Sequence, residues 1–344
     1  MCGIVGGTSE RNILPILVEG LRRLEYRGYD SAGVAFKKNG TISITKNKGR
    51  VEQLAKKLNL KENQSNLGVA HTRWATHGIP SEKNAHPHVS KNIFVVHNGI
   101  IENHNELKAQ LKAEGIRFST QTDTEVIAHL IKTYTEKGQS FEKAVFNTIK
   151  RLKGAYALGI IDKNDPEQVI GVRNQSPLVL GKGFQENFIA SDVMALAPVT
   201  NKFVYLDDGQ IALLNRHKAA VKNISRQTIR VKTHEVDSNA YTTDMAGHNH
   251  FMEKEIHEQP ETISHTISEM YNANGDMSEK LNEITKNNPN SITFLAAGTS
   301  YYAGLIAKYW IESLCKIPVN VEIASEYRYR EPFINPRGLI ISIS

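Results

Sequence analysis

The sequence predicts an α+β first part with largely antiparallel sheets, followed by a second part built on a parallel α/β sheet. In roughly the first two thirds of the 344 residues, many short apolar segments alternate with few amphipathic ones. Further on, strand, helix and strand patterns follow one another, which is typical of parallel sheets. In residues 216–247 between them the pattern weakens, and polar residues are mixed with Asp, Ser, Asn and Gly. We therefore predict domains at 1–215 and 248–344, joined by a linker at 216–247.

The first part begins with an apolar, glycine-broken segment, which predicts a buried strand over residues 1–7. Leucine and valine then recur at helical spacing from Leu14 to Leu24, so a helix should follow. Asn39-Gly40 stands between two strand-like runs and predicts a hairpin turn. Residues 122–125 (TDTE) have the pattern of a capping box, which predicts a helix opening there. The remaining strands are predicted at 67–71, 93–97, 155–161, 169–173, 178–181, 188–191, 203–206 and 210–214.

The second part begins with a helix predicted from Met252 to Tyr271. Strands are predicted at 291–297, 319–323 and 339–343, and a helix runs to about Leu314 after the first of them. The sequence ends directly after the last strand. Because a strand of a parallel sheet needs a covering helix, we expect this second domain to be incomplete.

Composition argues against several classes of protein. The 42 Lys+Arg against 36 Asp+Glu give a net charge of +6, but the basic residues are scattered, so nucleic acid is not expected as a partner. Only two cysteines occur, which excludes a disulfide framework. No apolar run approaches about 18 residues and none follows a charged start, so we expect no membrane span and no signal peptide. A cytoplasmic location is the expectation.

Cys2 is the first candidate for chemistry, because methionine is usually removed before a small residue. The free α-amine would then lie on the same residue as the thiol. An α-amine has a pKa of about 7.7–8.0, so near neutral pH it can act as the base for its own nucleophile. The alternative is that Cys2 is only a small buried residue near a terminus.

Further polar groups follow predicted strands. Arg73, within residues 71–78, is suited to a bidentate grip on a carboxylate. Asn98 and Gly99 offer an amide and a backbone N–H as a pair of oxyanion donors. Each cluster could instead be an ordinary turn, and Asp123 could be a helix cap. Metal ligands are conceivable at the two closely spaced pairs His86/His88 and His248/His250, but no cysteine or carboxylate completes a set, so no metal is predicted.

Residues 1–6 (MCGIVG) resemble the start of the N-terminal-nucleophile glutamine amidotransferases. Together with them, five further strings resemble the family of isomerising glutamine:fructose-6-phosphate amidotransferases, the glucosamine-6-phosphate synthases. These strings are residues 24–33 (LEYRGYDSAG), 71–78 (HTRWATHG), 84–88 (NAHPH), 96–103 (VHNGIIEN) and 122–125 (TDTE). The resemblance implies a four-layer αββα sandwich of the N-terminal-nucleophile hydrolases, followed by an incomplete αβα sugar-isomerase domain.

The resemblance also implies roles in glutamine hydrolysis. Cys2 would be nucleophile and base together, and Asn98 and Gly99 would form the oxyanion hole. Arg73 would bind the α-carboxylate of L-glutamine, and Asp123 its α-ammonium group. The remaining residues of the implied glutamine pocket are Trp74, Thr76 and His77, of which Trp74 is similar to the tryptophan that gates an ammonia passage in the family. No cofactor is implied.

In the second part, Gly298, Thr299 and Ser300 join a strand to a helix where a phosphate could bind, although an ordinary tight turn is the alternative. Residues 322–330 also resemble the family, and Ser344 would begin its phosphate loop. The family's second sugar-isomerase half has no counterpart in these residues, so we expect glutaminase activity here and an incomplete site for fructose 6-phosphate. The family implies a homodimer for the full-length protein. The alternatives are another N-terminal-nucleophile amidotransferase and a non-catalytic sugar-phosphate-binding protein.

Overall fold

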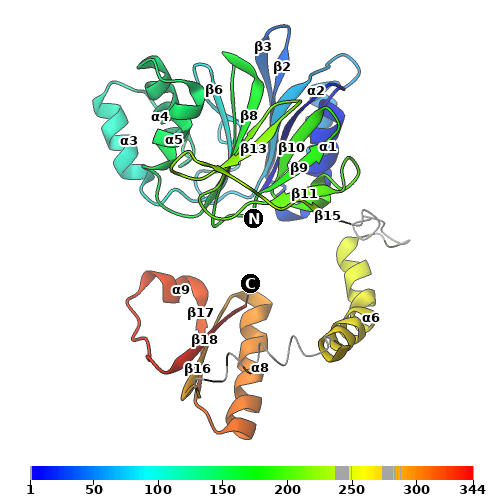
Figure 1. The fold of residues 1–344 in the computed structure, drawn as a ribbon, viewed down its shortest axis with the longest axis vertical. Coiled ribbons are helices and arrows are strands. Elements are labelled where there is room, and N and C mark those ends of the chain that lie inside the picture. The colour runs from blue at the N-terminus through cyan, green and yellow to red at the C-terminus, as the bar shows by residue number, and fades with distance from the viewer. Residues whose placement is uncertain are drawn as a thin grey trace. The chain divides into compact units, whose positions relative to one another are not determined.

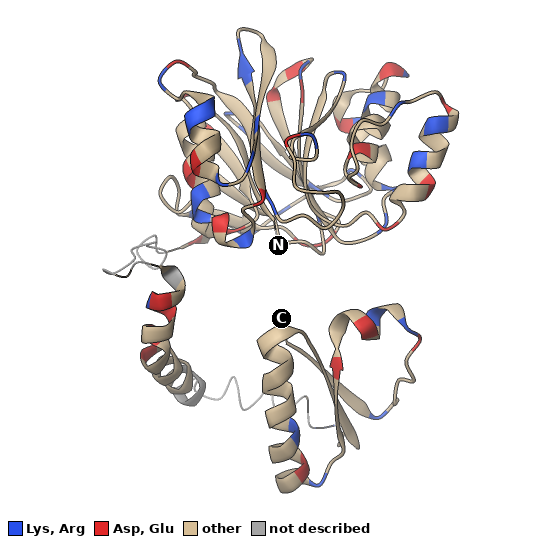
Figure 2. Ribbon diagram, turned by 180° about the vertical axis from the view of Figure 1, so that it is seen from behind, with Lys and Arg blue, Asp and Glu red and all other residues tan. Residues whose placement is uncertain are grey.

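The computed structural model describes residues 2–236, 248, 250–272, 282, 284, 286 and 288–343, and the chain divides into two compact units, Met1–Thr243 and Asp244–Ser344 (Figure 1). Among the described residues, no helix is both long and apolar enough to span a bilayer. Lysine and arginine are interspersed with aspartate and glutamate on the helices and loops of both units (Figure 2).

The first unit is built on two sheets. The eight-stranded sheet has the order β15-β11-β9-β10-β1-β4-β2-β3 and its pairs are antiparallel. Its strands are β1 (Gly3–Ser9), β2 (Ser31–Lys38), β3 (Thr41–Lys48), β4 (Leu67–Arg73), β9 (Val179–Gly183), β10 (Glu186–Ala190), β11 (Lys202–Tyr205) and β15 (His234–Glu235).

The seven-stranded sheet has the order β14-β13-β12-β8-β7-β6-β5 and is also antiparallel. Its strands are β5 (His88–Ser90), β6 (Ile93–Gly99), β7 (Tyr156–Asp162), β8 (Asp165–Asn174), β12 (Ile211–Leu214), β13 (Ala219–Lys222) and β14 (Thr228–Ile229). In both sheets the strands predicted from apolar runs are present, with ends shifted by a few residues.

The two sheets face each other, and helices cover both outer faces (Figure 1). Between the sheets lies an apolar core to which β1, β4 and β10 contribute from one side and β6, β7 and β8 from the other. Helices α1 (Leu14–Arg23) and α2 (Val51–Leu58) pack on the eight-stranded sheet. Helices α3 (His104–Ala113), α4 (Glu125–Glu136) and α5 (Phe141–Ile149) pack on the other sheet. Short 3-10 turns, η1 (Glu25–Arg27) and η2 (Val193–Ala195), complete the unit. The predicted four-layer αββα sandwich is confirmed.

Local sequence explains much of this architecture. The hairpin β2–β3 turns at Asn39 and Gly40, which both have positive φ (49° and 73°) as a two-residue turn between antiparallel strands requires. Strands β1 and β7 are buried along their whole length because one sheet face meets the other sheet and the opposite face meets helices. This double coverage explains why their sequences are apolar runs rather than alternating patterns.

Two predictions were wrong. Residues 216–235 do not belong wholly to a linker, because β13 and β14 extend the seven-stranded sheet and β15 pairs with β11. The rest of the predicted linker, 237–247, lies outside the described residues. The capping box does not form either: α4 begins at Glu125 after Thr124, which makes no side-chain cap bond. The Glu125 carboxylate instead accepts hydrogen bonds from the backbone and hydroxyl groups of Ser119 and Thr120, at 2.7–2.9 Å.

The second unit contains a parallel three-stranded sheet of order β17-β16-β18. Its strands are β16 (Ser291–Ala296), β17 (Val319–Ile323) and β18 (Gly338–Ile343), and its helices are α6 (Phe251–Asn272), α8 (Gly298–Cys315) and α9 (Ala324–Tyr329). Helix α8 packs on β16 and β17. The predicted strand–helix–strand pattern is confirmed.

Candidate functional site

Cys2 immediately precedes β1, which lies between β10 and β4 inside the eight-stranded sheet. Its Sγ lies 3.2 Å from the backbone nitrogen of Trp74, which donates to it, and 3.5 Å from the Trp74 carbonyl oxygen. Burial raises the pKa of the Cys2 thiol, and the N–H of Trp74 opposes that rise only in part. The thiol is therefore protonated at neutral pH and needs a base before it can act as a nucleophile.

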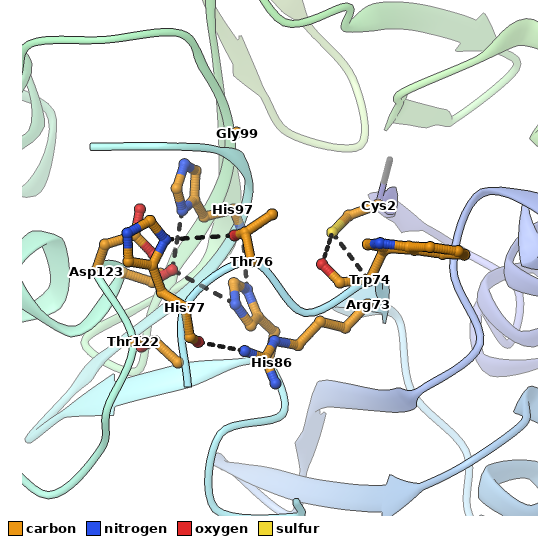
Figure 3. A pocket seen from close by; sticks show the side chains of 11 residues that line it. Cys2, Arg73, Trp74, Thr76, His77, His86, His97, Gly99, Thr122 and Asp123 are labelled. Atoms are coloured by element: carbon orange, nitrogen blue, oxygen red, sulfur yellow. Dashed lines mark hydrogen bonds between the residues drawn. The ribbon is translucent and has the colours of Figure 1, made fainter. Parts of the chain in front are cut away.

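A small cavity opens beside this thiol. It is lined by Cys2, Arg73, Trp74, Thr76, His77, His86, His97, Gly99, Thr122, Asp123 and Thr124 (Figure 3). Cys2 precedes β1 and His86 precedes β5, and the other residues come from the end of β4 with the loop after it, the end of β6 and the residues before α4. The topology thus brings five separate segments to one place, because β1 and β4 are neighbours and β6 lies in the facing sheet.

Arg73 ends β4 and is only 3% exposed. Its Nη2 donates to the carbonyl oxygens of His77 and Gly78, which fixes the plane of the guanidinium group. Its Nη1 is buried and has no hydrogen-bond partner within the described part of the chain. A buried cationic donor without an acceptor is costly, so this nitrogen is suited to a carboxylate of a bound molecule.

Asp123 supplies the opposite charge to the same cavity. It is 4% exposed and stands just before α4, where its Oδ2 accepts a hydrogen bond from the backbone nitrogen of Ile101 at 2.8 Å. That bond holds the carboxylate in place although the residue makes no cap on the helix. The cavity therefore presents one fixed cation and one fixed anion, as a zwitterionic ligand requires.

Asn98 and Gly99 end β6 beside Cys2. The Asn98 Nδ2 donates to the carbonyl oxygen of Cys2 at 3.0 Å, and Asn98 does not itself line the cavity. Gly99 has φ +117°, and a Cβ at this position would lie 2.0 Å from the carbonyl oxygen of Ala155. Only glycine fits there, so its backbone reaches the cavity at a point that no side chain could occupy.

The loop after β4 carries the other predicted residues. Trp74 is 48% exposed and contacts the ring of Tyr29 edge-on, with centroids 5.7 Å apart. His77 packs edge-to-face against His104 at 5.1 Å, and its Nδ1 lies 3.4 Å from the Thr76 hydroxyl. The structure thus brings together the predicted glutaminase residues in or beside one cavity.

Four cavity residues were not predicted as ligands: His86, His97, Thr122 and Thr124. His97 lies within an apolar strand, and periodicity alone indicates only that it is buried. His86 and His88, considered as metal ligands, instead bond the backbone nitrogen of His97 and the Thr122 hydroxyl, at 3.1 Å each. Within the described residues, no group of three or more metal-binding side chains is found.

The predicted phosphate-binding residues belong to the second unit. Gly298, Thr299 and Ser300 form the first turn of α8 directly after β16, rather than a loop before the helix. Gly298 has φ +57°. Ser344 lies outside the described residues.

Comparison with known proteins adds independent evidence. Residues 71–198 match a glutamine amidotransferase domain family, and residues 261–344 match the SIS domain family. The chain is 50% identical over 348 aligned residues to the isomerising glutamine–fructose-6-phosphate aminotransferase of Acinetobacter baylyi, covering 100% of this chain and 56% of that protein. It therefore spans about half the length of this relative.

Two solved structures share the fold. The allosteric regulatory enzyme of purine biosynthesis is 27% identical, with a TM-score of 0.58 over 66% of this chain and 50% of that one. Glutamine phosphoribosylpyrophosphate amidotransferase from B. subtilis is 18% identical, with a TM-score of 0.59 over 96% of this chain and 69% of that one. The likeness supports the same sandwich of two sheets.

Proposed function

We propose that this chain, in which a glutamine amidotransferase domain is followed by part of a SIS domain, hydrolyses L-glutamine at Cys2 and supplies the ammonia that the full protein uses to convert fructose 6-phosphate into glucosamine 6-phosphate. The observation that carries the glutaminase part is the buried, unpartnered Nη1 of Arg73 in a cavity that also holds Asp123 and the Cys2 thiol. The acceptor of the product ammonia is proposed from the whole-chain similarity to glutamine–fructose-6-phosphate aminotransferase.

Recognition of glutamine follows from charge. Arg73 binds the α-carboxylate through Nη1, and Asp123 binds the α-ammonium group. The side chain of glutamine then points toward Cys2, with Thr76, His77 and Trp74 lining the same cavity. A ligand lacking either charge would leave one buried ion unpaired, which costs several kcal/mol by order of magnitude. The cavity is therefore selective for ligands that carry both an α-carboxylate and an α-ammonium group.

The hydrolysis takes place in two steps. After removal of Met1, which lies outside the described residues, the neutral α-amine of Cys2 accepts the thiol proton, and the thiolate attacks the side-chain amide carbon of glutamine. The second N–H of Asn98 Nδ2 and the backbone N–H of Gly99 stabilise the resulting oxyanion. The amide nitrogen of the intermediate takes the proton from the α-ammonium group and leaves as ammonia, and a thioester remains. Water, deprotonated by the same amine, then releases glutamate and restores the thiol.

The second unit provides the start of the sugar site. Gly298, Thr299 and Ser300 at the N-terminus of α8 offer backbone N–H groups and hydroxyls to the phosphate of fructose 6-phosphate, with Ser344 as a further contact. The 344 residues are proposed to carry the glutaminase half-reaction alone. We also propose that the glutaminase domain extends through residue 236, that the full protein is a cytoplasmic homodimer, and that neither nucleic acid nor membrane is a partner.

The test measures glutamate and glucosamine 6-phosphate in one reaction containing glutamine, fructose 6-phosphate and the purified chain with Met1 removed. We expect glutamate without amino sugar. The Cys2→Ala variant should lose glutamate release, whereas Cys315→Ala, the matched control at the exposed second cysteine, should retain it. Retention of Met1 should also abolish the activity, because it blocks the amine. Glutamate release by Cys2→Ala would refute the assignment, and stoichiometric amino sugar would show that these residues suffice for the whole reaction.

A further inference from the structure

The ring of His71 joins the two sheets of the first unit beside the cavity. His71 lies on β4 of the eight-stranded sheet and is fully buried. Its Nε2 lies 2.9 Å from the carbonyl oxygen of His97 and 3.0 Å from Oδ1 of Asn98, both on β6 of the facing sheet. Nε2 of His71 therefore contacts the side chain of Asn98, whose amide nitrogen bonds the backbone of Cys2.

The partners of this ring determine where its proton lies. A backbone carbonyl can only accept a hydrogen bond, so Nε2 must carry the hydrogen, which the carbonyl oxygen of His97 and Oδ1 of Asn98 share. Burial lowers the pKa of His71 to about 3, so the ring is neutral near pH 7 and Nδ1 carries no hydrogen. Consistent with this, Nδ1 has no hydrogen-bond partner among the described residues, and the ring stacks on that of His86 with centroids 4.1 Å apart.

The same reasoning determines the orientation of the Asn98 amide, whose oxygen and nitrogen must be assigned from their partners. On one side the amide faces the Nε2–H of His71, which requires the oxygen there. On the other side it faces the carbonyl oxygen of Cys2, 3.0 Å away, which requires the NH2 group there. Both sides give the same assignment, and the NH2 group has a second hydrogen in addition to the one bonded to Cys2.

We infer that His71 is a positioning residue for glutamine hydrolysis: its Nε2–H holds Oδ1 of Asn98, so that the NH2 group of Asn98 faces Cys2 and the developing oxyanion. This role rests on the function proposed above. Without the donor on His71, the Asn98 amide can turn over and present its oxygen to the oxyanion. Two oxygens with partial negative charge would then repel each other in the transition state, while glutamine binding through Arg73 and Asp123 would be unaffected.

The kinetic test uses two variants of the chain with Met1 removed. His71→Phe keeps a planar ring against His86 but has no donor, and His71→Gln restores an N–H donor. Loss of one oxyanion donor lowers kcat about 100- to 1000-fold. A donor that is present but no longer held in one orientation should lower kcat by less than that. We expect kcat for glutamine hydrolysis to fall about 10- to 100-fold in His71→Phe with KM changed less than about threefold, and to recover in part in His71→Gln. An unchanged kcat in His71→Phe would overturn the role.

A double-mutant cycle with Asn98→Ala separates positioning from general damage to the fold. If His71 acts through Asn98, His71→Phe should lower kcat less than about twofold in the Asn98→Ala background. The same 10- to 100-fold loss in both backgrounds would show that His71 acts by another route, which contradicts the inference. His129→Phe is the matched control, because His129 is also buried but bonds Ser90 rather than Asn98. It should leave kcat unchanged.

The proton on His71 can be observed without any activity. The ¹⁵N chemical shifts of the His71 ring in the folded chain should show a protonated Nε2 and a bare Nδ1 from pH 6.5 to pH 8, and a proton on Nδ1 would overturn the inference. Failure of the unmodified chain to hydrolyse glutamine would contradict the proposed function instead, so the two failures are distinguishable.

Discussion

Four histidine rings are buried together between the two sheets, and they predict a steep loss of stability in mild acid. His71, His86, His88 and His97 are each at most 4% exposed. The His86 ring lies 4.1 Å from that of His71, 4.6 Å from that of His88 and 6.3 Å from that of His97, measured between centroids. A proton on the His86 ring would place a buried charge beside the three other rings. The fold therefore accommodates all four only in their neutral form.

The magnitude follows from linkage. Burial lowers the pKa of His71 from 6.5 to about 3, and lowers the pKa values of the other three rings as well. Below pH 6.5 the unfolded chain binds a proton at each histidine while the folded chain does not, so stability is complete above that pH and falls as pH decreases. Each such histidine lowers the free energy of unfolding by about 1.4 kcal/mol for every unit by which the pH decreases. Four together lower the free energy of unfolding by at most about 5 kcal/mol per unit, so a domain with a typical stability of about 5–15 kcal/mol should unfold no sooner than about one to three units below pH 6.5.

The assay is urea denaturation at constant ionic strength between pH 7.5 and pH 5.0, with the free energy of unfolding plotted against pH. We expect a plateau above pH 7 and a slope approaching 5 kcal/mol per unit below pH 6. His88→Gln should reduce the slope by about a quarter, whereas His217→Gln, at an exposed position, should not change it. A slope below about 1.4 kcal/mol per unit would mean that the buried rings take up protons in the fold, and would refute the reasoning.

Three further outcomes are expected. Gly99→Ala should lower the free energy of unfolding by about 2–4 kcal/mol, because its φ is positive and the new Cβ would collide with the backbone of Ala155. Gly115→Ala, also at positive φ but in open space, should lower it by only about 1–2 kcal/mol, and equal losses in urea titrations would contradict the predicted collision. Arg73→Lys and Asp123→Asn should each raise the KM for glutamine about 10- to 100-fold, because each variant loses a charge-assisted hydrogen bond to the substrate. An unchanged KM in steady-state kinetics would place the glutamine-binding site elsewhere. Burial alone would raise the pKa of Glu125, but hydrogen bonds from His129, Ser119 and Thr120 outweigh burial and lower that pKa. Glu125→Gln should therefore lower the free energy of unfolding by about 2–4 kcal/mol above pH 5. An unchanged thermal unfolding midpoint at pH 7 would contradict this.

Much of the fold is predictable from short-range signals. The β2–β3 hairpin follows from Asn39-Gly40, and the length of α1 follows from apolar spacing between Leu14 and Leu21. Continuous apolar runs predict strands such as β7 because they are buried on both faces. These signals depend only on neighbours in the sequence, so one sequence suffices to find them.

The errors occur where distant partners decide. Thr122 and Glu125 have the residue types of a capping box, yet Thr122 bonds His88 and Glu125 bonds the loop at Ser119 and Thr120. The polar residues after 216 form β13, β14 and β15, which extend the two sheets at one edge each because those edges offer unpaired backbone groups, and no local pattern reveals this. Partners outside the helix or strand itself thus overrode a local preference in each case.

In the candidate site, too, the sequence indicates the residue types, whereas the fold decides where they lie. Residue types at Cys2, Arg73 and Asp123 indicate a nucleophile and two opposite charges, but not that they share a cavity. They meet because β1 pairs with β4 in one sheet, which puts Cys2 next to the end of the strand that carries Arg73. The facing sheet then brings the end of β6 and the start of α4 to the same edge, and the bond from His71 to Asn98 exists only because these two sheets are stacked. A residue that acts across the layers is therefore invisible to motif analysis, and the structure is needed to assign His71 a role.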